Sequence, residues 1–530
     1  MRSVMVHQFS QIPQANIQRS SFDRSHGYKT TFDAGQLVPF YLDEVLPGDT
    51  FNLGASLFAR VNTPVVPIMD NMYLETFFFF VPTRLVWDNW QRFNGEQLNP
   101  GDSTDFLIPT LADQTQFGYA SLGDYFGIPT GVKLNDINAL PFRCYNLIYN
   151  EWFRDENLQD SLSVPKGDGP DDPSIYVLKR RGKRHDYFTS ALPWPQKGPG
   201  VELPLGTVAP VGFADSSFDY QAGKSYRGYN PDTSLSKFVF SSGGASPSDP
   251  QTPFSASIVG SDVTLGGNVS PLFADLSSAT AATINSLREA FQLQRLLEAD
   301  ARGGTRYTEL IRSHFGVISP DARLQRPEYL GGSSTRIHIN PVTQTSSTDS
   351  TSPQGNLSAY GVAGDNIHGF TKSFTEHGYI IGLVNVRADL TYQQGLNRMW
   401  SRRTRFDFYW PTLAHLGEQA VLNKEIYAQG TDADDDVFGY QERYAEYRYY
   451  PSVITGRFRS TDPTPLDFWH LSQKFDSLPT LSSDFIEDKP PMERIVAVTT
   501  EPNFLLDCYF NLKCVRPMPV YSVPGFIDHF

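Results

Sequence analysis

The stretch FNLGASLFARV, residues 51–61, alternates apolar and polar side chains and decides the fold class of this chain. Phe51 and Leu53 fall on one side of the repeat, and Asn52 falls on the other. Successive side chains of a β-strand point to opposite faces, so a repeat of two residues predicts a strand with one buried face. Such a strand needs a second layer to pack against.

Further strand patterns lie at both ends of the chain. Residues 73–81, YLETFFFFV, are apolar on both sides and predict a central strand covered on both faces. Residues 506–514, LDCYFNLKC, alternate again. Residues 379–390 and 439–450 also have strand character. Since strands at the two ends can pair in a jelly roll, we expect an all-β jelly-roll sandwich rather than an immunoglobulin-like one, whose short, evenly spaced strands are missing.

Composition agrees with an all-β protein that has long ordered loops. Aromatic residues make up 13% of the 530 residues and charged residues only 19%, while 41 Gly and 38 Pro supply many turns. The net charge of -14 argues against a surface that binds polyanions everywhere, so any contact with nucleic acid is expected to be local. Phe77–Val81, the longest strongly apolar stretch, is too short to span a bilayer, and the first 17 residues lack the apolar core of a secretory signal.

The three cysteines predict reduced thiols and assembly in a cytosol. Cys508 and Cys514 are expected on one strand, about 20 Å apart at about 3.4 Å per residue, which is too far for a disulfide. With Cys144 the count is odd, and no short spacing suggests a zinc site.

The middle of the chain differs from its flanks. Residues 196–280 are rich in Gly, Pro and Ser and are too long for an ordinary loop, so we interpret them as an insertion. The chain is then divided into residues 1–195, with an N-terminal arm and the first strands, the insertion, and residues 281–530, with the remaining strands of one discontinuous domain. A helix is expected from residue 284 to its end at Gly303 and Gly304, a second one at 307–315, and an exposed polar loop at 343–358.

Enzyme and metal motifs are largely missing. Gly223-Lys224-Ser225 resembles the end of a phosphate-binding loop, but Phe218 stands where that loop needs glycine. The run Asp432–Asp436 resembles the start of a calcium loop, but Val437 replaces the turn glycine, which favours a solvated turn. We expect no catalytic residues, no cofactor and no metal, although a looser calcium site between subunits stays an alternative.

Two basic clusters are the candidate nucleic-acid-binding residues. The first places five cations within six residues: Lys179, Arg180, Arg181, Lys183 and Arg184. The second places three cations among aromatic residues: Arg402, Arg403 and Arg405, beside Trp400, Phe406, Phe408, Tyr409 and Trp410. Cations for phosphates beside rings for base stacking are typical of proteins that bind single-stranded nucleic acid without sequence preference.

Each cluster also has a structural interpretation, in which the arginines bridge carboxylates of neighbouring chains and the rings are core. For Arg402–Arg405 this interpretation has at least equal weight, since a stripe of rings more often packs than binds. For Lys179–Arg184 phosphate binding is favoured modestly, because so dense a run repels itself without an anionic partner.

Several separated blocks resemble gokushovirus major capsid proteins of the microvirus family. These blocks are Phe77–Trp90, Arg288–Gln294 leading into Ala301–Tyr307, and Phe438–Tyr449. The resemblance runs from about residue 7 to the C-terminus. In the insertion it concerns position and composition only.

The resemblance implies an eight-stranded jelly roll with large loop insertions and a few short helices. It implies pentamers that assemble into the smallest class of icosahedral shell (T=1) around circular single-stranded DNA. The implied partners are a DNA pilot protein, small internal or scaffolding proteins and a host cell-surface receptor. The implied locations are the virion and, during assembly, the host bacterial cytoplasm. The insertion would form a protrusion at each three-fold axis for host contact, with a flexible loop that binds no receptor as the alternative.

Two other functions have less support in the sequence. A β-rich carbohydrate-active enzyme could use a pair such as Asp434 and Glu442, but their spacing does not favour it. A sequence-specific DNA-binding protein would need a reading helix, which no pattern here indicates, and the overall charge has the wrong sign.

Overall fold

The computed structural model describes residues 18–201, 211–213, 225–229, 236–241, 272–274, 284–302, 313, 325–349 and 353–521. The chain divides into two compact units, one made of residues 1–197 and 298–530 and the other of residues 198–297. Strands in antiparallel sheets predominate, with few helices, as the sequence predicts. Among the described residues, no helix is long and apolar enough to cross a membrane.

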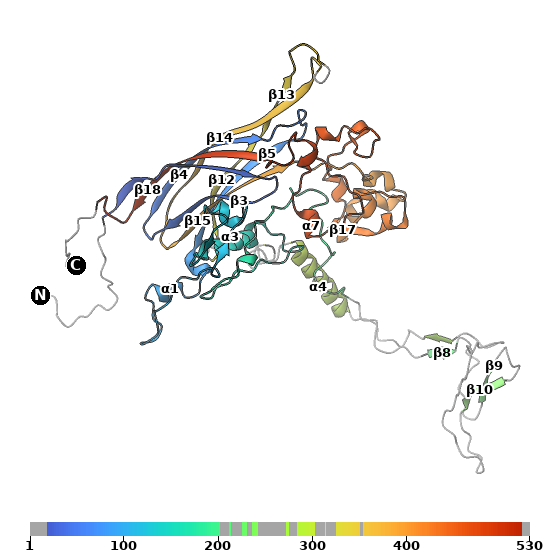
Figure 1. The fold of residues 1–530 in the computed structure, drawn as a ribbon. Helices are drawn as coiled ribbons and strands as arrows, with labels where there is room; N and C mark the ends of the chain where they lie inside the picture. The colour runs from blue at the N-terminus through green and yellow to red at the C-terminus, as the bar shows by residue number, and fades with distance from the viewer. Residues whose placement is uncertain are drawn as a thin grey trace. The chain divides into compact units, whose positions relative to one another are not determined.

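A six-stranded sheet joins strands from both ends of the chain to two strands within residues 338–373, and it contains the alternating stretch 51–61 (Figure 1). Its order is β1–β18–β4–β14–β13, and β2 also pairs with β18. The strands are β1 (Ser20–Asp23), β2 (His26–Phe32), β4 (Thr50–Val61), β13 (His338–Thr343), β14 (Leu357–Ser373) and β18 (Phe504–Arg516). The expected pairing of the first and last strands is confirmed.

The second sheet has four strands, in the order β12–β5–β15–β3. They are β3 (Val38–Val45), β5 (Met72–Pro82), β12 (Glu328–Arg336) and β15 (Gly378–Ala388). The number of eight strands stays a prediction. β1 and β2 both lie along β18, and β12 and β13 are separated only by Ile337, so the count depends on whether each pair is one strand or two.

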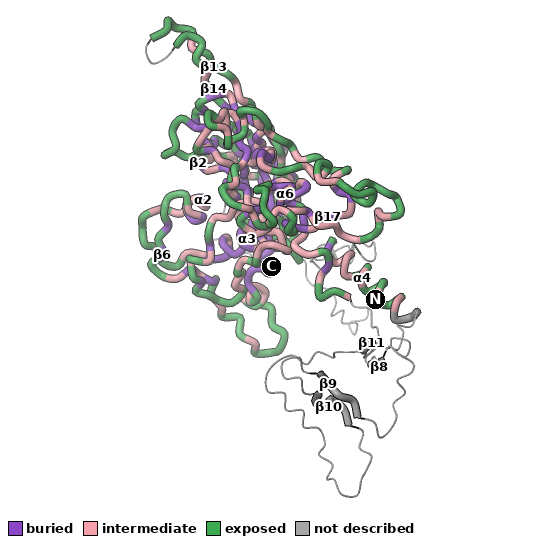
Figure 2. Tube along the Cα trace, turned by 90° about the vertical axis from the view of Figure 1, so that its right-hand side faces the viewer, coloured by how far each residue is buried: buried purple, intermediate pink, exposed green. Residues whose placement is uncertain are grey.

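The main core fills the space between the two sheets. Phe51 on β4 and Phe510 on β18 come from one sheet, and Phe78 on β5 and Ile380 on β15 come from the other. Buried and exposed residues alternate along β18 from Phe504 to Cys514, as the sequence predicts for a strand with one buried face. Figure 2 shows the buried residues gathered in this region and exposed residues along the β13–β14 hairpin.

A second core covers the other face of the four-stranded sheet. Phe79 and Val81 on β5 pack there in one cluster with Trp87 and with Phe142 of α3 (Leu140–Ile148). β5 is thus a central strand covered on both faces, which confirms the prediction from its unbroken apolar run. Cys144 of α3 is buried here, and Cys508 and Cys514 are buried on β18, all three as free thiols.

Except for α4, the remaining helices and strands are short. The helices are α1 (Trp90–Phe93), α2 (Leu122–Tyr125), α4 (Ile284–Arg302), α6 (Asn423–Ile426) and α7 (Ser483–Ile486). β6 (Thr115–Gln116) pairs with β7 (Lys133–Leu134), and β16 (Glu418–Leu422) pairs with β17 (Val437–Glu442). α4 confirms the first predicted helix, and the second, at 307–315, lies outside the described residues except for position 313. The predicted polar loop is confirmed between β13 and β14, where its described residues are mostly exposed.

The strand expected over residues 439–450 is wrong beyond Glu442. β17 ends there, and Tyr444 adopts a left-handed conformation with φ 63°, which a strand cannot contain. A 3-10 turn, η8 (Ala445–Tyr447), follows. The β16–β17 hairpin belongs to neither large sheet and packs in a third hydrophobic cluster with Tyr187 and Phe188.

The core between the sheets gives a test with an adjacent control. Phe510→Ala removes a fully buried ring that lies 5.5 Å from the Phe40 ring and 5.0 Å from the Tyr41 ring, measured between centroids. We expect it to lower the free energy of unfolding by about 3–5 kcal/mol, because it leaves a cavity. Tyr509→Ala, at the neighbouring position that is 55% exposed, should change it by about 0.5 kcal/mol. Urea unfolding of the unassembled protein measures both, and equal losses would contradict this assignment of faces.

Candidate nucleic-acid interface

The first basic cluster lies on an extended segment fixed on both sides by backbone hydrogen bonds. The Arg181 N–H donates to Gly35 O at 2.8 Å, and the Lys183 N–H donates to Ile486 O at 2.7 Å. The Leu37 N–H in turn donates to Lys179 O at 2.9 Å. The segment is therefore part of the folded scaffold, and the positions of its side chains are set by the fold.

Three guanidinium groups surround one buried carboxylate, that of Glu75 on β5. Arg181 forms a short ion pair with it, Arg184 lies 3.3 Å away and Arg387 of β15 lies 2.9 Å away. We call Glu75, Arg181, Arg184 and Arg387 the Glu75 cluster. Arg184 also pairs with Asp389 at 3.0 Å. Glu75 is 7% exposed, so the attraction is screened little by solvent.

The neighbouring cations are also held inside the protein. Lys183 is buried and donates to Gln473 Oε1 at 2.8 Å and to Phe485 O at 2.5 Å. Burial lowers the pKa of Lys183 to about 8, because the charged form loses its hydration. Arg180 donates to Ala34 O at 2.8 Å. Burial also disfavours the charged form of nearby Asp488 and raises its pKa to about 6, although the surrounding cations act to lower this pKa.

The dense run of cations does not need an external anion to offset its internal repulsion, since the carboxylates of Glu75 and Asp389 already lie among the cations. A surplus of positive charge persists, however, because three arginines share Glu75. Burial, followed by repulsion from Arg387, lowers the pKa of Arg181 to about 10. A cavity of about 550 Å³ lies beside the cluster, and its lining includes Arg154, Arg181, Arg184 and Arg387. Phosphate binding by Lys179–Arg184 stays a prediction, with this cavity as its place.

The second basic cluster follows β15 and has a different character. It spans the 3-10 turns η4 (Arg398–Ser401) and η5 (Arg405–Asp407). Trp400 is 71% exposed and Phe406 64%, and Phe408, Tyr409 and Trp410 are also exposed. The rings of this segment therefore belong to none of the three hydrophobic cores of the described chain, against the interpretation of them as core.

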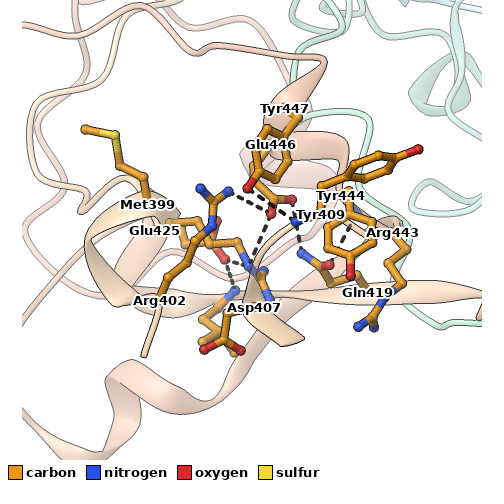
Figure 3. Close-up of polar contacts among 12 residues, drawn as sticks. Met399, Arg402, Asp407, Tyr409, Gln419, Glu425, Arg443, Tyr444, Glu446 and Tyr447 are labelled. Carbon is orange, nitrogen blue, oxygen red and sulfur yellow. Dashed lines mark hydrogen bonds and ion pairs between the residues drawn. The ribbon is translucent and has the colours of Figure 1, made fainter. Parts of the chain in front are cut away.

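Figure 3 shows Arg402 beside Glu446 and Tyr447. Arg402 donates to Glu446 at 3.2 Å and lies over the Tyr447 ring at 4.2 Å. Arg405 lies over the Trp410 ring at 4.5 Å. Arg403 and Arg405 are exposed and form no ion pair within the described part of the chain. This segment thus presents two cations without an ion pair in the described chain, next to exposed aromatic side chains.

Sequence reasoning missed Glu75, Arg387 and Arg154. A signal for Glu75 was present, since a single carboxylate within the apolar run 73–81 needs a buried cation as partner. The partners themselves lie 106 and 312 residues away, and nothing in the sequence pattern connects them.

The acidic run forms a 3-10 turn, η7 (Asp432–Asp435), in which the carboxylates of Asp434 and Asp435 already have partners within the chain. Asp434 accepts from the Gln429 N–H at 2.9 Å and the Gly430 N–H at 2.7 Å, and Asp435 pairs with Lys424 at 2.5 Å. Across the described residues, no group of three or more His, Cys, Asp or Glu side chains is arranged to hold a metal ion. Glu442, the other carboxylate of the enzyme alternative, pairs with Arg448.

Comparisons with known proteins agree along nearly the whole chain. Residues 10–526 match the family model described as "Capsid protein (F protein)". The chain is 52% identical to "Capsid protein VP1" of Bdellovibrio phage phiMH2K, over 99% of this chain and 98% of the relative. It is 49% identical to "Capsid protein VP1" of Chlamydia phage 1, again over 99% and 98%. The protein of the same name from Spiroplasma virus 4 is 37% identical, over 98% and 97%.

The Glu75 cluster predicts a large loss of stability when its shared carboxylate is removed. Glu75→Gln leaves three buried or half-buried guanidinium groups without their common counter-ion, and we expect it to lower the free energy of unfolding by about 3–5 kcal/mol. Asp389→Asn removes only the more exposed partner of Arg184 and should cost at most about 1 kcal/mol. Urea unfolding of the unassembled protein compares them. If the two substitutions cost the same, Glu75 does not have this central role.

Proposed function

The chain belongs to the F capsid protein family, and from this premise we propose that it assembles into a small icosahedral shell around the circular single-stranded DNA of a bacteriophage. Members of this family and the named relatives are capsid proteins, so the chain is a structural protein and not an enzyme. The observation that carries the proposal is the 52% identity to a phage capsid protein across 99% of this chain.

The physical basis of assembly is the burial of exposed apolar and aromatic surface between identical copies. Closed symmetry then limits the size of the product, since each subunit presents the same contacts to its neighbours. We propose pentamers as the intermediate and the T=1 shell as the product, formed in the host cytoplasm and found in the virion. A DNA pilot protein and small internal or scaffolding proteins are the proposed viral partners.

For contact with the genome we propose the two basic clusters: Lys179, Arg180, Arg181, Lys183 and Arg184, and Arg402, Arg403 and Arg405. The supports differ. The first cluster borders a cavity with surplus positive charge, whereas the second presents exposed cations and rings. Because Arg403 and Arg405 make no ion pair with described residues, their replacement tests DNA contact with the least disturbance of the fold.

Particles purified from a producing host test the proposed shell. We expect electron microscopy to show closed shells and the extracted nucleic acid to be circular and sensitive to a nuclease specific for single-stranded DNA. Shells that carry only double-stranded DNA, or protein that never forms shells in such a host, would refute the proposal.

The variant Arg403→Gln/Arg405→Gln extends this test. Losing two cations should reduce the slope of log affinity against log salt for a single-stranded oligonucleotide by about 1.4, at about 0.7 per cation. We expect sedimentation to show a larger share of empty shells. The matched control is Lys133→Gln/Lys474→Gln, which removes the same charge outside both basic clusters. If both variants package DNA equally well, the second cluster does not contact the genome.

We also propose that the insertion, residues 196–280, contributes to host attachment through a cell-surface receptor. Residues 198–297 form a compact unit separate from the jelly roll. Within it β8 (Val211–Phe213) pairs with β11 (Leu272–Ala274), and β9 (Ser225–Tyr229) pairs with β10 (Ser236–Ser241). Both pairs are antiparallel, and β9 and β10 lie between β8 and β11 in the sequence.

Deleting residues 205–275 tests this second part. Because the jelly roll is built from other residues, we expect shells to form while adsorption to host cells falls at least tenfold. Adsorption is measured as the loss of free particles from the medium over time. Unchanged adsorption by the shortened particles would favour a loop that binds no receptor.

A further inference from the structure

A pocket lies beside the exposed aromatic segment, and Phe406 of that segment lines it. Its cavity measures about 260 Å³ and lies between the turns η4 and η5, the β16–β17 hairpin and α6. Its lining contains four cationic side chains, Arg398, Arg402, Lys424 and Arg443, and two carboxylates, Asp407 and Glu425. Arg398, Arg402 and Lys424 already pair with Glu425, Glu446 and Asp435, so Arg443 is the one lining cation without an ion pair among the described residues.

Four polar groups that line this pocket have a buried atom with no hydrogen-bond partner. They are the Nε atoms of Arg402 and Arg443 and the hydroxyl groups of Ser401 and Tyr444. Tyr444 is only 3% exposed, so its hydroxyl cannot obtain a partner from bulk solvent. Buried polar groups without partners are costly, and four around one cavity indicate a site shaped for hydrogen-bond acceptors.

The pocket's own carboxylates do not meet this need. Glu425 already accepts from Arg398 at 2.9 Å, from the Leu422 N–H at 3.0 Å and from Tyr187 at 2.9 Å. Asp407 accepts from the Arg403 and Thr404 N–H groups. Arg443 has no ion pair with any described residue, and its guanidinium group lies 4.9 Å from the centroid of the Tyr444 ring. Within the described chain these donors have no acceptor, so an acceptor from outside the chain can serve them.

The backbone at Tyr444 supports a specific role for this place. Its φ of 63° and ψ of 25° lie in the left-handed region, which a bulky residue seldom occupies, and such conformations concentrate at functional sites. This conformation ends β17 and brings Arg443 and Tyr444 to the pocket together. Tyr409 packs edge-on against Tyr444, with 5.2 Å between ring centroids, and so links the pocket to the exposed segment.

We propose that this pocket binds a backbone phosphate of single-stranded DNA, with the donors of Ser401, Arg402, Arg443 and Tyr444 directed to its oxygens. A phosphate oxygen accepts several hydrogen bonds at once, which suits two guanidinium groups and two hydroxyls. Phe406 also lines the pocket and is 64% exposed, so an adjacent base can stack on its ring. The inference rests on the proposed enclosure of single-stranded DNA, because it names the groups that contact the genome.

Binding of a fluorescent 12-residue oligothymidylate to the unassembled full-length protein tests the pocket. Arg443→Gln should weaken binding at least tenfold and reduce the salt slope by about 0.7. Tyr444→Phe, which keeps the ring and removes only the hydroxyl, should weaken it roughly two- to tenfold. Arg448→Gln is the matched control. Arg448 lies in the same segment, but it pairs with Glu442 and does not line the pocket.

Two further measurements use the wild-type protein and so do not depend on how the variants fold. An oligonucleotide carrying 5-iodouracil should crosslink on irradiation to the peptide that contains Phe406 or to the one that contains Tyr444. Inorganic phosphate should displace the oligonucleotide only at concentrations far above those of the DNA; displacement at equal phosphate concentration would assign the pocket to free phosphate and overturn the proposal.

The remaining outcomes separate the pocket from the shell. Wild-type affinity in both pocket variants, or crosslinks confined to other peptides, would refute the pocket while leaving a shell that contains single-stranded DNA intact. Loss of pentamers with unchanged oligonucleotide binding would assign the donors to a carboxylate of a second copy, and would equally overturn it. Absence of single-stranded DNA from wild-type particles would instead refute the proposed function.

Discussion

The need to cover both faces of the four-stranded sheet determines much of this structure. β5 carries apolar side chains in both directions, so one face requires the six-stranded sheet and the other requires α3 and its flanking loops. A two-layer sandwich alone would leave Phe79 and Val81 in water. The long segments between the strands are therefore part of the core of this protein, and they bring polar residues close to the sheet.

Glu75 is a buried carboxylate on an otherwise largely apolar strand of that sheet, and it accounts for the positions of Arg181 and Arg184 in the first basic run. A carboxylate on a covered strand is stable only if cations accompany it, and the segment 179–184 supplies two of its three arginines. Two cations of this dense run, Arg181 and Arg184, are thus counter-charges for one buried acid. The second basic cluster lacks such an internal partner for Arg403 and Arg405, and its rings are exposed. Similar sequence patterns thus have different physical origins.

Local patterns predicted the strands well and the side-chain environments poorly. The strands β4, β5 and β18 could be predicted from the sequence pattern. A strand buried on one face alternates apolar and polar residues, and a strand buried on both faces is an unbroken apolar run. The end of β17 does not, since no pattern announces that Tyr444 takes a left-handed conformation. The contact of Arg181 with Glu75 joins positions 106 residues apart, and only the folded chain reveals it. The exposure of Trp400 and Phe406 likewise depends on which loops happen to cover them.

The place of β18 in the six-stranded sheet has a consequence for protein synthesis. β18 lies between β4 on one side and β1 and β2 on the other, yet it is the last of these strands to leave the ribosome. Until then β4 has an unpaired edge, and the growing chain exposes the apolar surface that Phe510 and its neighbours will cover. A product cut short by early termination therefore cannot complete this sheet, which restricts incorporation into a particle to chains translated through residue 516.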